Sequence, residues 1–281
     1  GYGTFHLPEG SWTDDSSMTL AALDSIREKK TIDPADIMSR FALWLQKGEY
    51  TPFGRSFDIG GGCYQAILNF LRNPELGPAW GGSDEWDNGN GSLMRIMPAC
   101  LYCYSEEKAG RMTEKEAVCQ IHLVSGLTHN HLRAKTACGL YFFMTREILD
   151  GGGNLTGRLQ QGLNRGFAFY EKDLENAGQL SYFKHLKNLT ELQQMSRENI
   201  RSSGYVIDTM EAAVWSLITT GSLKEALLLA VNLGGDTDTV AAIAGGIAGL
   251  YYGYEEIPDD WRKVIQRRIW IERMCREMDL N

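Results

Sequence analysis

Apolar residues recur at helical spacing along most of this chain. Met210, Ala213, Val214 and Leu217 lie three or four positions apart, the spacing that places side chains on one face of an α-helix. Further stripes of the same kind precede and follow this one, whereas the alternation typical of a half-buried strand is nearly absent. The sequence therefore predicts an all-α protein with about ten or more helices.

Helix ends are signalled at several places. Asp33 followed by Pro34 is typical of an N-cap with proline at the first helical position, and we expect that helix to end at Gly48. Thr113 and Glu116 have the spacing of a capping box ahead of another apolar stripe. These signals predict short turns between the helices.

Composition excludes several classes of protein. The 281 residues are 43% apolar and 23% charged, which predicts one folded core and a single domain over 1–281. The net charge of −8 argues against a nucleic-acid binder, and no apolar run reaches the ~20 residues needed to cross a bilayer. With six scattered cysteines expected to be reduced and no signal peptide, we expect a cytoplasmic monomer without nucleic-acid or membrane partners.

An early acidic cluster lies near the start of the chain. It consists of Thr13, Asp14 and Asp15 and precedes an apolar helical stripe. Thr13 can cap that helix while the two aspartates occupy its first turn, so capping alone is about as good an interpretation as a binding site.

A late acidic cluster lies near the end. Gly234 and Gly235 permit a turn with positive φ, and Asp236, Thr237, Asp238 and Thr239 then fill the cap and first turn of a helix. One aspartate would satisfy a cap, and buried carboxylates repel one another unless a cation or protons neutralise them. Together the clusters supply four carboxylates and several hydroxyls, ligands that favour two Mg²⁺ or Mn²⁺ ions over zinc. Capping alone remains the alternative.

Three other features could contribute to a site. The run from Asn88 to Arg95 could form a phosphate-binding nest ahead of a helix, although spacing alone favours a plain Asn-Gly turn. His129 could contact a sugar or phosphate, or be an ordinary surface or capping histidine. Asp58 could project into the cleft, but the sequence slightly favours a cap for the helix that follows Gly60. The segment 151–203, which opens with three glycines, could be an insertion or a lid, but the default interpretation is a mobile surface excursion.

As an ordered set, these strings resemble the ADP-ribosylglycohydrolase family, which includes the dinitrogenase reductase-activating glycohydrolases. The resemblance spans nearly the whole chain, and the late acidic cluster is its most specific part. The matching strings are Gly10-Ser11-Trp12-Thr13-Asp14-Asp15, Phe57-Asp58-Ile59-Gly60, Gly89-Asn90-Gly91-Ser92-Leu93-Met94-Arg95, Thr128-His129, Ser203-Gly204-Tyr205 and Gly234-Gly235-Asp236-Thr237-Asp238-Thr239.

The resemblance implies an orthogonal multi-helix domain with a two-metal centre in a cleft. Its implied metal ligands are Thr13, Asp14, Asp15, Asp236, Asp238 and Thr239. The loop formed by Gly89, Asn90, Gly91, Ser92, Leu93 and Met94 would hold the diphosphate, His129 would contact the ADP-ribose, and Tyr205 would stack near the adenine. Asp58 would serve as an acid or base beside the distal ribose, with Asp15 and Asp238 as further catalytic candidates.

The implied activity is metal-dependent hydrolysis that removes ADP-ribose from a protein side chain, with arginine as the first choice. Family members usually begin with a helix that carries a Gly-Asp-Ala-Leu-Gly string and a glutamate that reaches the site, and we expect this chain to lack that helix. Two alternatives stay open. The cleft could bind ADP-ribosylated protein or neutralise a toxin without turnover, or it could hydrolyse a small ADP-ribose conjugate.

Overall fold

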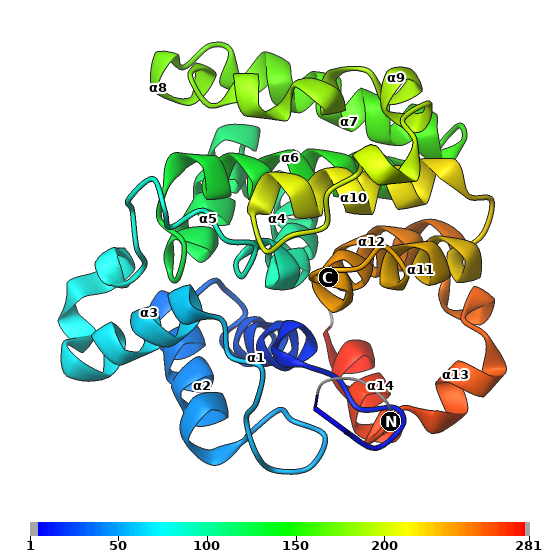
Figure 1. Ribbon diagram of the computed structural model, residues 1–281. Coiled ribbons are helices and arrows are strands. Elements are labelled where there is room, and N and C mark those ends of the chain that lie inside the picture. The colour runs from blue at the N-terminus through cyan, green and yellow to red at the C-terminus, as the bar shows by residue number, and fades with distance from the viewer. Residues whose placement is uncertain (1–4, 279–281) are drawn as a thin grey trace.

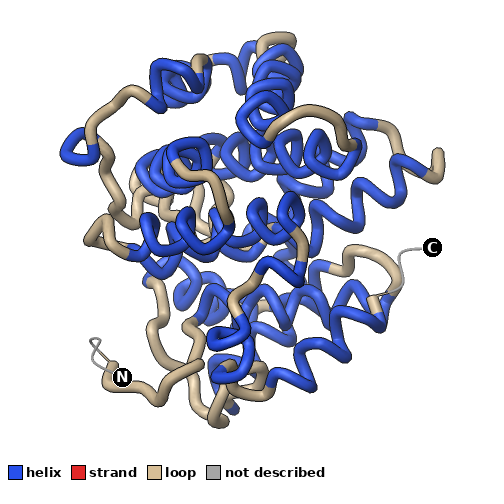
Figure 2. The backbone as a smooth tube through the Cα atoms, turned by 90° about the vertical axis from the view of Figure 1, so that its right-hand side faces the viewer, coloured by secondary structure: helices blue, strands red, loops and turns tan. Residues whose placement is uncertain are grey.

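The described residues, 5–278 apart from the side chains of Pro78 and Leu174, fold entirely from helices and loops in a computed structural model. No β-strand occurs in this range, so the all-α prediction is confirmed (Figure 2). The α-helices are α1 (Asp14–Lys29), α2 (Pro34–Lys47), α3 (Gly61–Arg72), α4 (Met97–Lys108), α5 (Glu114–Gly126), α6 (Leu132–Asp150), α7 (Leu155–Tyr170), α8 (Leu174–Ala177), α9 (Leu189–Gln193), α10 (Val206–Thr219), α11 (Leu223–Val231), α12 (Thr237–Tyr252), α13 (Asp259–Val264) and α14 (Arg268–Glu277). Short 3₁₀ segments are η1 (Pro74–Trp80), η2 (Leu93–Arg95), η3 (Leu180–Lys187), η4 (Arg197–Asn199) and η5 (Tyr254–Glu256).

The helices are stacked in tiers (Figure 1). α7, α8 and α9 cover one end, α5, α6 and α10 lie beneath them, and α1, α2 and α3 form the opposite part. α12, the last long apolar helix of the chain, packs against α1, α6 and α10 and therefore lies in the middle of the folded protein. This arrangement brings the N-terminal end of α12 close to α1 although more than two hundred residues separate them along the chain.

The predicted helix ends agree with the structure at α2 and α5. The Asp33 carboxylate accepts hydrogen bonds from the backbone N–H groups of Ala35 and Asp36, and Gly48 ends α2 in the left-handed conformation at φ 67°. At α5 both hydrogen bonds of the Thr113–Glu116 capping box are present. Local chemistry at these ends was therefore sufficient to place them.

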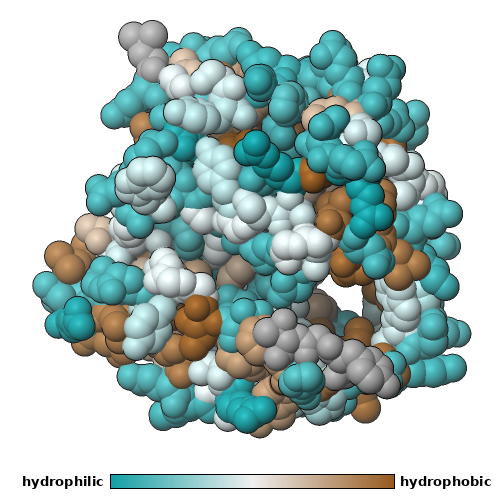
Figure 3. Space-filling view, viewed as in Figure 1, coloured by the Kyte–Doolittle hydropathy of each residue, from teal (hydrophilic) through white to brown (hydrophobic). Residues whose placement is uncertain are grey.

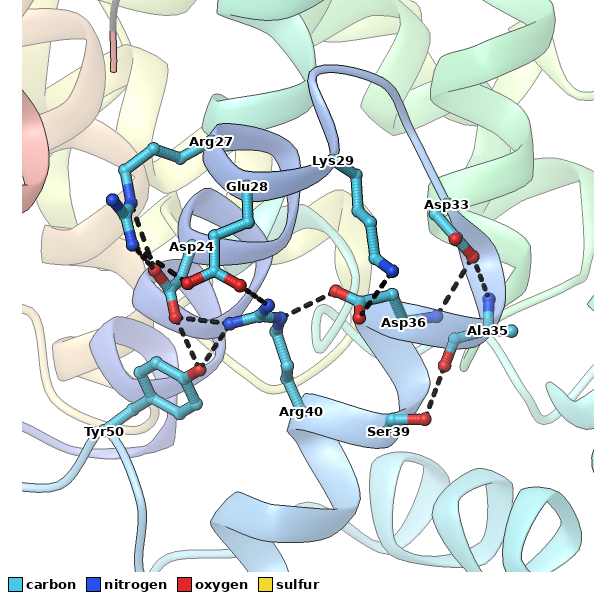
Figure 4. Close-up of polar contacts among 10 residues, drawn as sticks. All are labelled: Asp24, Arg27, Glu28, Lys29, Asp33, Ala35, Asp36, Ser39, Arg40 and Tyr50. Atoms are coloured by element: carbon cyan, nitrogen blue, oxygen red, sulfur yellow. Dashed lines mark hydrogen bonds and ion pairs between the residues drawn. The ribbon is translucent and has the colours of Figure 1, made fainter. Parts of the chain in front are cut away.

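Arg40 fastens α2 to α1 (Figure 4). Its guanidinium forms ion pairs with two residues of α1, Asp24 and, at 2.7 Å, Glu28. It forms a third ion pair, also at 2.7 Å, with Asp36 of α2. The hydroxyl of Tyr50 joins the same group, receiving a hydrogen bond from Arg40 Nη1 at 2.9 Å. This network fixes the direction of α1, whose first turn carries the early acidic cluster.

The excursion 151–203 is helical and partly buried. Gly151, Gly152 and Gly153 all have positive φ, a conformation that glycine adopts without strain, and they end α6. α7 then folds back along α6, and buried residues of η3 and α9 continue the core. Whether this segment moves as a lid stays a prediction.

Among residues 5–278 no helix is both long and apolar enough to cross a bilayer.

Candidate active site

A polar pocket of about 270 Å³ opens where the first turns of α1, α3 and α12 meet the loop ahead of α4. Its walls come from six separate stretches of the sequence. The lining residues are Asp14, Asp58, Gly60, Gly61, Gly62, Cys63, Gly89, Asn90, Gly91, Met94, His129, Gly204, Asp236, Asp238 and Thr239. The pocket thus brings together most of the predicted site residues.

The early acidic cluster is buried at the start of α1. Thr13 occupies the N-cap position, but its side chain does not cap the helix, and the capping interpretation is wrong. Its hydroxyl instead donates to Asp15 Oδ2 at 2.8 Å, while Asp15 Oδ1 is buried without any hydrogen-bond partner. An unpaired buried carboxylate oxygen is costly, so this atom is suited to a further ligand.

The side chain at the N-cap position of the late acidic cluster does not cap its helix either. Asp236 occupies the N-cap position of α12 without a side-chain capping bond. Its Oδ2 accepts a hydrogen bond of 2.8 Å from Asn90 Nδ2. Burial raises the pKa of both Asp236 and Asp15, and the hydroxyl of Thr239, which lies near both carboxyl groups, opposes that shift, so Thr239 lies between the two clusters. Gly235 has φ 72°, and a Cβ there would lie 2.4 Å from Ser202 O, so the turn before α12 requires glycine.

Burial and mutual repulsion perturb the carboxyl groups of the pocket. Burial, followed by the charges of Asp15, Asp58 and Asp238, raises the pKa of Asp14 to about 8. Burial and then the charge of Asp238 raise the pKa of Asp15 to about 7. These shifts show that the two clusters share one electrostatic environment.

The neighbouring donors do not form a finished cation cage. Within the described part of the chain, no three His, Cys, Asp or Glu side chains are arranged as a ready metal site. The oxygens that are close together belong to aspartates and threonines, which are ligands of hard cations.

Asp58 lies in the pocket and does not cap a helix. Gly60 is the N-cap residue of α3, where no side chain caps the helix, so the preference for a capping Asp58 is wrong. Asp58 has φ 52°, a left-handed conformation uncommon outside glycine, asparagine and aspartate. Burial, followed by the charges of Asp238 and Asp236, raises its pKa to about 6. A carboxyl group with this pKa exchanges protons readily near neutral pH.

The loop from Gly89 to Met94 contributes to the pocket unevenly. Gly89, Asn90, Gly91 and Met94 line it, whereas Ser92 is fully buried and receives a hydrogen bond from Ser125 Oγ. Leu93 faces a different cavity. The Asn90 N–H already donates to Gly204 O at 3.0 Å and the Met94 N–H to Asn90 O at 3.1 Å, so neither amide is open to a phosphate.

His129 is seated among glycines. Cβ atoms on Gly62, Gly89 and Gly91 would lie 3.0, 3.1 and 2.8 Å from its ring, so the absence of side chains makes room for it. Burial and then the charge of Arg95 lower its pKa to about 3, so the ring is neutral. The ring nitrogen Nδ1 lies 2.9 Å from Thr128 Oγ1, and that oxygen also accepts from Arg95 Nη2. Because the Thr128 proton can then point at Nδ1, the pairing favours a proton on Nε2.

Arg95 and Tyr205 lie outside the pocket. Arg95 is fully buried, donates to Val124 O and Thr128 and stacks on Phe41, so it positions His129 from behind. Tyr205 follows Gly204, a lining residue, and its hydroxyl accepts from Arg133 Nη1 at 3.1 Å. The predicted stacking of Tyr205 on adenine stays a prediction.

Arg133 is a buried residue near the pocket that no sequence motif indicates. This residue is only 3% exposed, its guanidinium lies 3.5 Å from the centre of the Tyr182 ring, and it pairs with Glu85 at 2.7 Å. It thereby joins η3 to the loop ahead of α4 and to the start of α10. Nothing in its local sequence distinguishes it from a solvated arginine on a helix.

A second hollow lies behind the acidic clusters. It has a volume of about 440 Å³ and is lined by residues that include Trp12, Thr13, Asp15, Asp238 and Trp261. Figure 3 shows an opening on this face between the region of α11 and α12 and that of α13 and α14. Asp238 lines both hollows, so the carboxyl cluster forms a wall between them.

Known proteins are similar to this chain over nearly its whole length. Residues 1–281 match the family model described as ADP-ribosylglycohydrolase. The chain is 34% identical over 280 residues to the ADP-ribosylarginine hydrolase Tri1 of Pseudomonas putida (strain GB-1), covering 99% of this chain and 68% of that protein. It is 30% identical over 269 residues to the ADP-ribosyl-[dinitrogen reductase] glycohydrolase of Rhodospirillum rubrum, with 96% and 78% covered.

The fold agrees as well. A solved structure described as an ADP-ribosylglycohydrolase-related protein complex is similar with a TM-score of 0.75 at 27% identity, covering 99% of this chain and 84% of that one. The resemblance seen in the motifs is therefore confirmed, and this chain belongs to the ADP-ribosylglycohydrolase family, a family of hydrolytic enzymes.

Proposed function

We propose that this protein removes ADP-ribose from modified arginine side chains of proteins by hydrolysing the bond between the arginine nitrogen and C1″ of the distal ribose. The observation that carries the proposal is the convergence of the two acidic clusters and Asp58 in one pocket. The choice of arginine rests on the similarity to the ADP-ribosylarginine hydrolase Tri1 of Pseudomonas putida (strain GB-1).

The pocket suits the distal end of ADP-ribose. At about 270 Å³ it is smaller than the roughly 300–1,000 Å³ of sites that enclose a drug-sized ligand. We therefore expect it to hold the distal ribose and part of the diphosphate, with the adenosine outside, beyond Gly204. The Nε2–H of His129 would donate to a ribose or phosphate oxygen, and the glycines around it let that oxygen approach.

The donor set fits two divalent cations. Asp15 Oδ1 is buried without a partner, and the pKa values of Asp14 and Asp15 are raised, so both carboxyls would gain from a bound cation. Thr13, Asp14, Asp15, Asp236, Asp238 and Thr239 would hold the ions. When bound, Mg²⁺ or Mn²⁺ would supply Lewis-acid stabilisation of oxygens that gain negative charge.

Asp58 would act as the general base and then as the general acid. In the hydrolysis a water oxygen bonds to C1″, the C1″–N bond breaks, and one proton passes from the water to the leaving guanidine. Asp58 lines the pocket and has a pKa of about 6, so it can accept the proton from water and return it to the guanidine nitrogen. Asn90 meanwhile fixes the orientation of Asp236.

Two substitutions test the proposal. Asp236→Ala and Asp238→Ala each remove a carboxylate from the junction of the clusters, so we expect both to abolish Mn²⁺ binding in calorimetry and release of ADP-ribose from a modified arginine peptide. Asp260→Ala, in the exposed first turn of α13, serves as the matched control and should change neither. Unaltered Mn²⁺ binding in both site variants would contradict the ligand set. Tight peptide binding without product in the wild-type protein would instead favour a non-catalytic binder.

A further inference from the structure

An acidic turn in the loop that leads into the pocket wall presents one tryptophan to solvent. Trp86 is 94% exposed, and it lies between Glu85 and Asp87 in the loop ahead of α4 (cyan in Figure 1). Soluble proteins seldom leave an indole uncovered, because its large apolar surface contributes more when it is buried.

The turn that carries Trp86 is held firmly. Asp87 N–H donates to Asp84 O at 2.9 Å, which closes a turn with Glu85 and Trp86 at its centre. The Asp84 N–H donates back to Asp87 Oδ2 at 2.9 Å, and Asn88 Nδ2 donates to Glu85 O at 2.8 Å. The exposure of Trp86 is therefore imposed by an ordered backbone.

Arg133 anchors the same turn to the body of the protein. Its guanidinium lies 2.7 Å from Glu85 Oε1, and this contact holds the pKa of Glu85 below its usual value. Gly82 packs so closely on the Asp87 carboxyl group that a Cβ would lie 2.4 Å away. The ordering extends to the indole's own neighbours along the chain, which lowers the entropic cost of using it as a contact.

The residues on both sides of the turn are paired with residues at or next to the pocket. Gly82 pairs with His129 in an isolated β-bridge, and Gly89 pairs with Tyr205 and lines the pocket. Trp86 follows Gly82 by four residues and precedes Gly89 by three, so its Cα lies within about 11 Å of the rim at full chain extension. The turn is therefore connected through Gly89 directly to the wall of the pocket.

The charged side chains next to Trp86 along the chain are all acidic, and the buried guanidinium of Arg133 neutralises only Glu85 among them. Asp84 and Glu85 are exposed beside it, and Asp87 is half-buried. An apolar anchor with acidic neighbours complements a surface that offers lysine or arginine side chains around an apolar patch.

We propose that Trp86 and its acidic turn dock the protein part of the substrate, recognising a basic surface around the modified arginine. This inference rests on the proposed function, since it requires a substrate linked to a folded protein. The turn would increase the affinity for an ADP-ribosylated protein but not for a small ADP-ribosyl compound, which has no protein surface to contact.

The test compares two substrates with the Trp86→Ala variant. Lysozyme modified with ADP-ribose on arginine supplies a basic folded substrate, and free ADP-ribosyl-arginine supplies the same bond without a protein surface. We expect Trp86→Ala to lower kcat/KM on modified lysozyme about tenfold or more, mainly through KM, which is the scale of an interface hot spot. Its kcat/KM on free ADP-ribosyl-arginine should stay unchanged.

Two further variants sharpen the comparison. Trp86→Phe should retain most of the activity on modified lysozyme, and Asp84→Asn should weaken the effect of added salt on that KM because it removes one attractive charge. Ile269→Ala, which alters another exposed apolar residue at 79% exposure on α14, is the control and should change neither substrate.

The outcomes separate the inference from the proposed function. An equal loss on both substrates would place Trp86 on the ADP-ribose itself and overturn the docking proposal, as would no loss on either. A wild-type protein that hydrolyses neither substrate overturns the proposed function and the docking proposal with it.

Discussion

Asp14 lies where burial and three neighbouring carboxyls act on one side chain. Its pKa rises to about 8, from a value near 4 expected for an exposed aspartate. Between those two values the folded protein keeps a proton that the unfolded chain releases. The contribution of Asp14 to the stability of the cation-free protein should therefore be fully present below about pH 4 and be lost as the pH rises towards 8.

We predict that Asp14→Asn reduces this pH dependence. Asparagine cannot ionise, so the contribution of this site, on the order of a few kcal/mol between pH 5 and pH 8, should disappear. The measurement is thermal unfolding in EDTA at several pH values for the wild-type and variant proteins. The same decline of Tm with pH in both would show that Asp14 ionises normally.

Residue types predicted which side chains gather at the pocket better than they predicted whether those side chains cap a helix. Aspartates near helix starts are ambiguous from sequence, because the same side chains cap helices and bind cations. The structure shows that Thr13, Asp58 and Asp236 do not cap. Thr13 donates to Asp15 two residues further on, Asp236 accepts from the distant Asn90, and Asp58 lines the pocket. The seat of His129 among Gly62, Gly89 and Gly91 also depends on tertiary contacts, which no local pattern reveals.

At the scale of elements, the helix ends were more predictable than the helix contacts. The cap at Asp33 and the capping box at Thr113 depend on residues within a few positions, so their chemistry is visible in the sequence. The contact between α6 and α7 is different. Gly162 lies so close to α6 that a Cβ would be 2.6 Å from Phe143 O and 2.7 Å from Met144 Cα.

We predict that Gly162→Ala destabilises the protein by about 1–3 kcal/mol, because the added methyl meets backbone that cannot move aside easily. Gly249→Ala in α12 is the matched control. A Cβ there meets nothing within 4 Å, so the better helix propensity of alanine should raise stability by up to about 1 kcal/mol. Urea unfolding measures both, and equal effects of the two substitutions would contradict the close packing of α6 and α7.

At the scale of the whole molecule, the two acidic clusters meet because α12 packs against α1. Helical periodicity predicted that both helices exist, but it carries no information on which helices are neighbours. The resemblance to the family, in contrast, implied that the two clusters form one metal centre, and this chain belongs to that family. The network around Arg40 and the hub at Arg133 stayed hidden, since both depend on residues brought together only by folding.

The most direct test of this account is anomalous diffraction from a crystal of the protein grown with Mn²⁺. Two peaks between the first turns of α1 and α12, within bonding distance of Asp14, Asp15, Asp236 and Asp238, are the expected result. A crystal saturated with Mn²⁺ that shows no peak there, with the carboxyls bonded only to one another, would contradict the account.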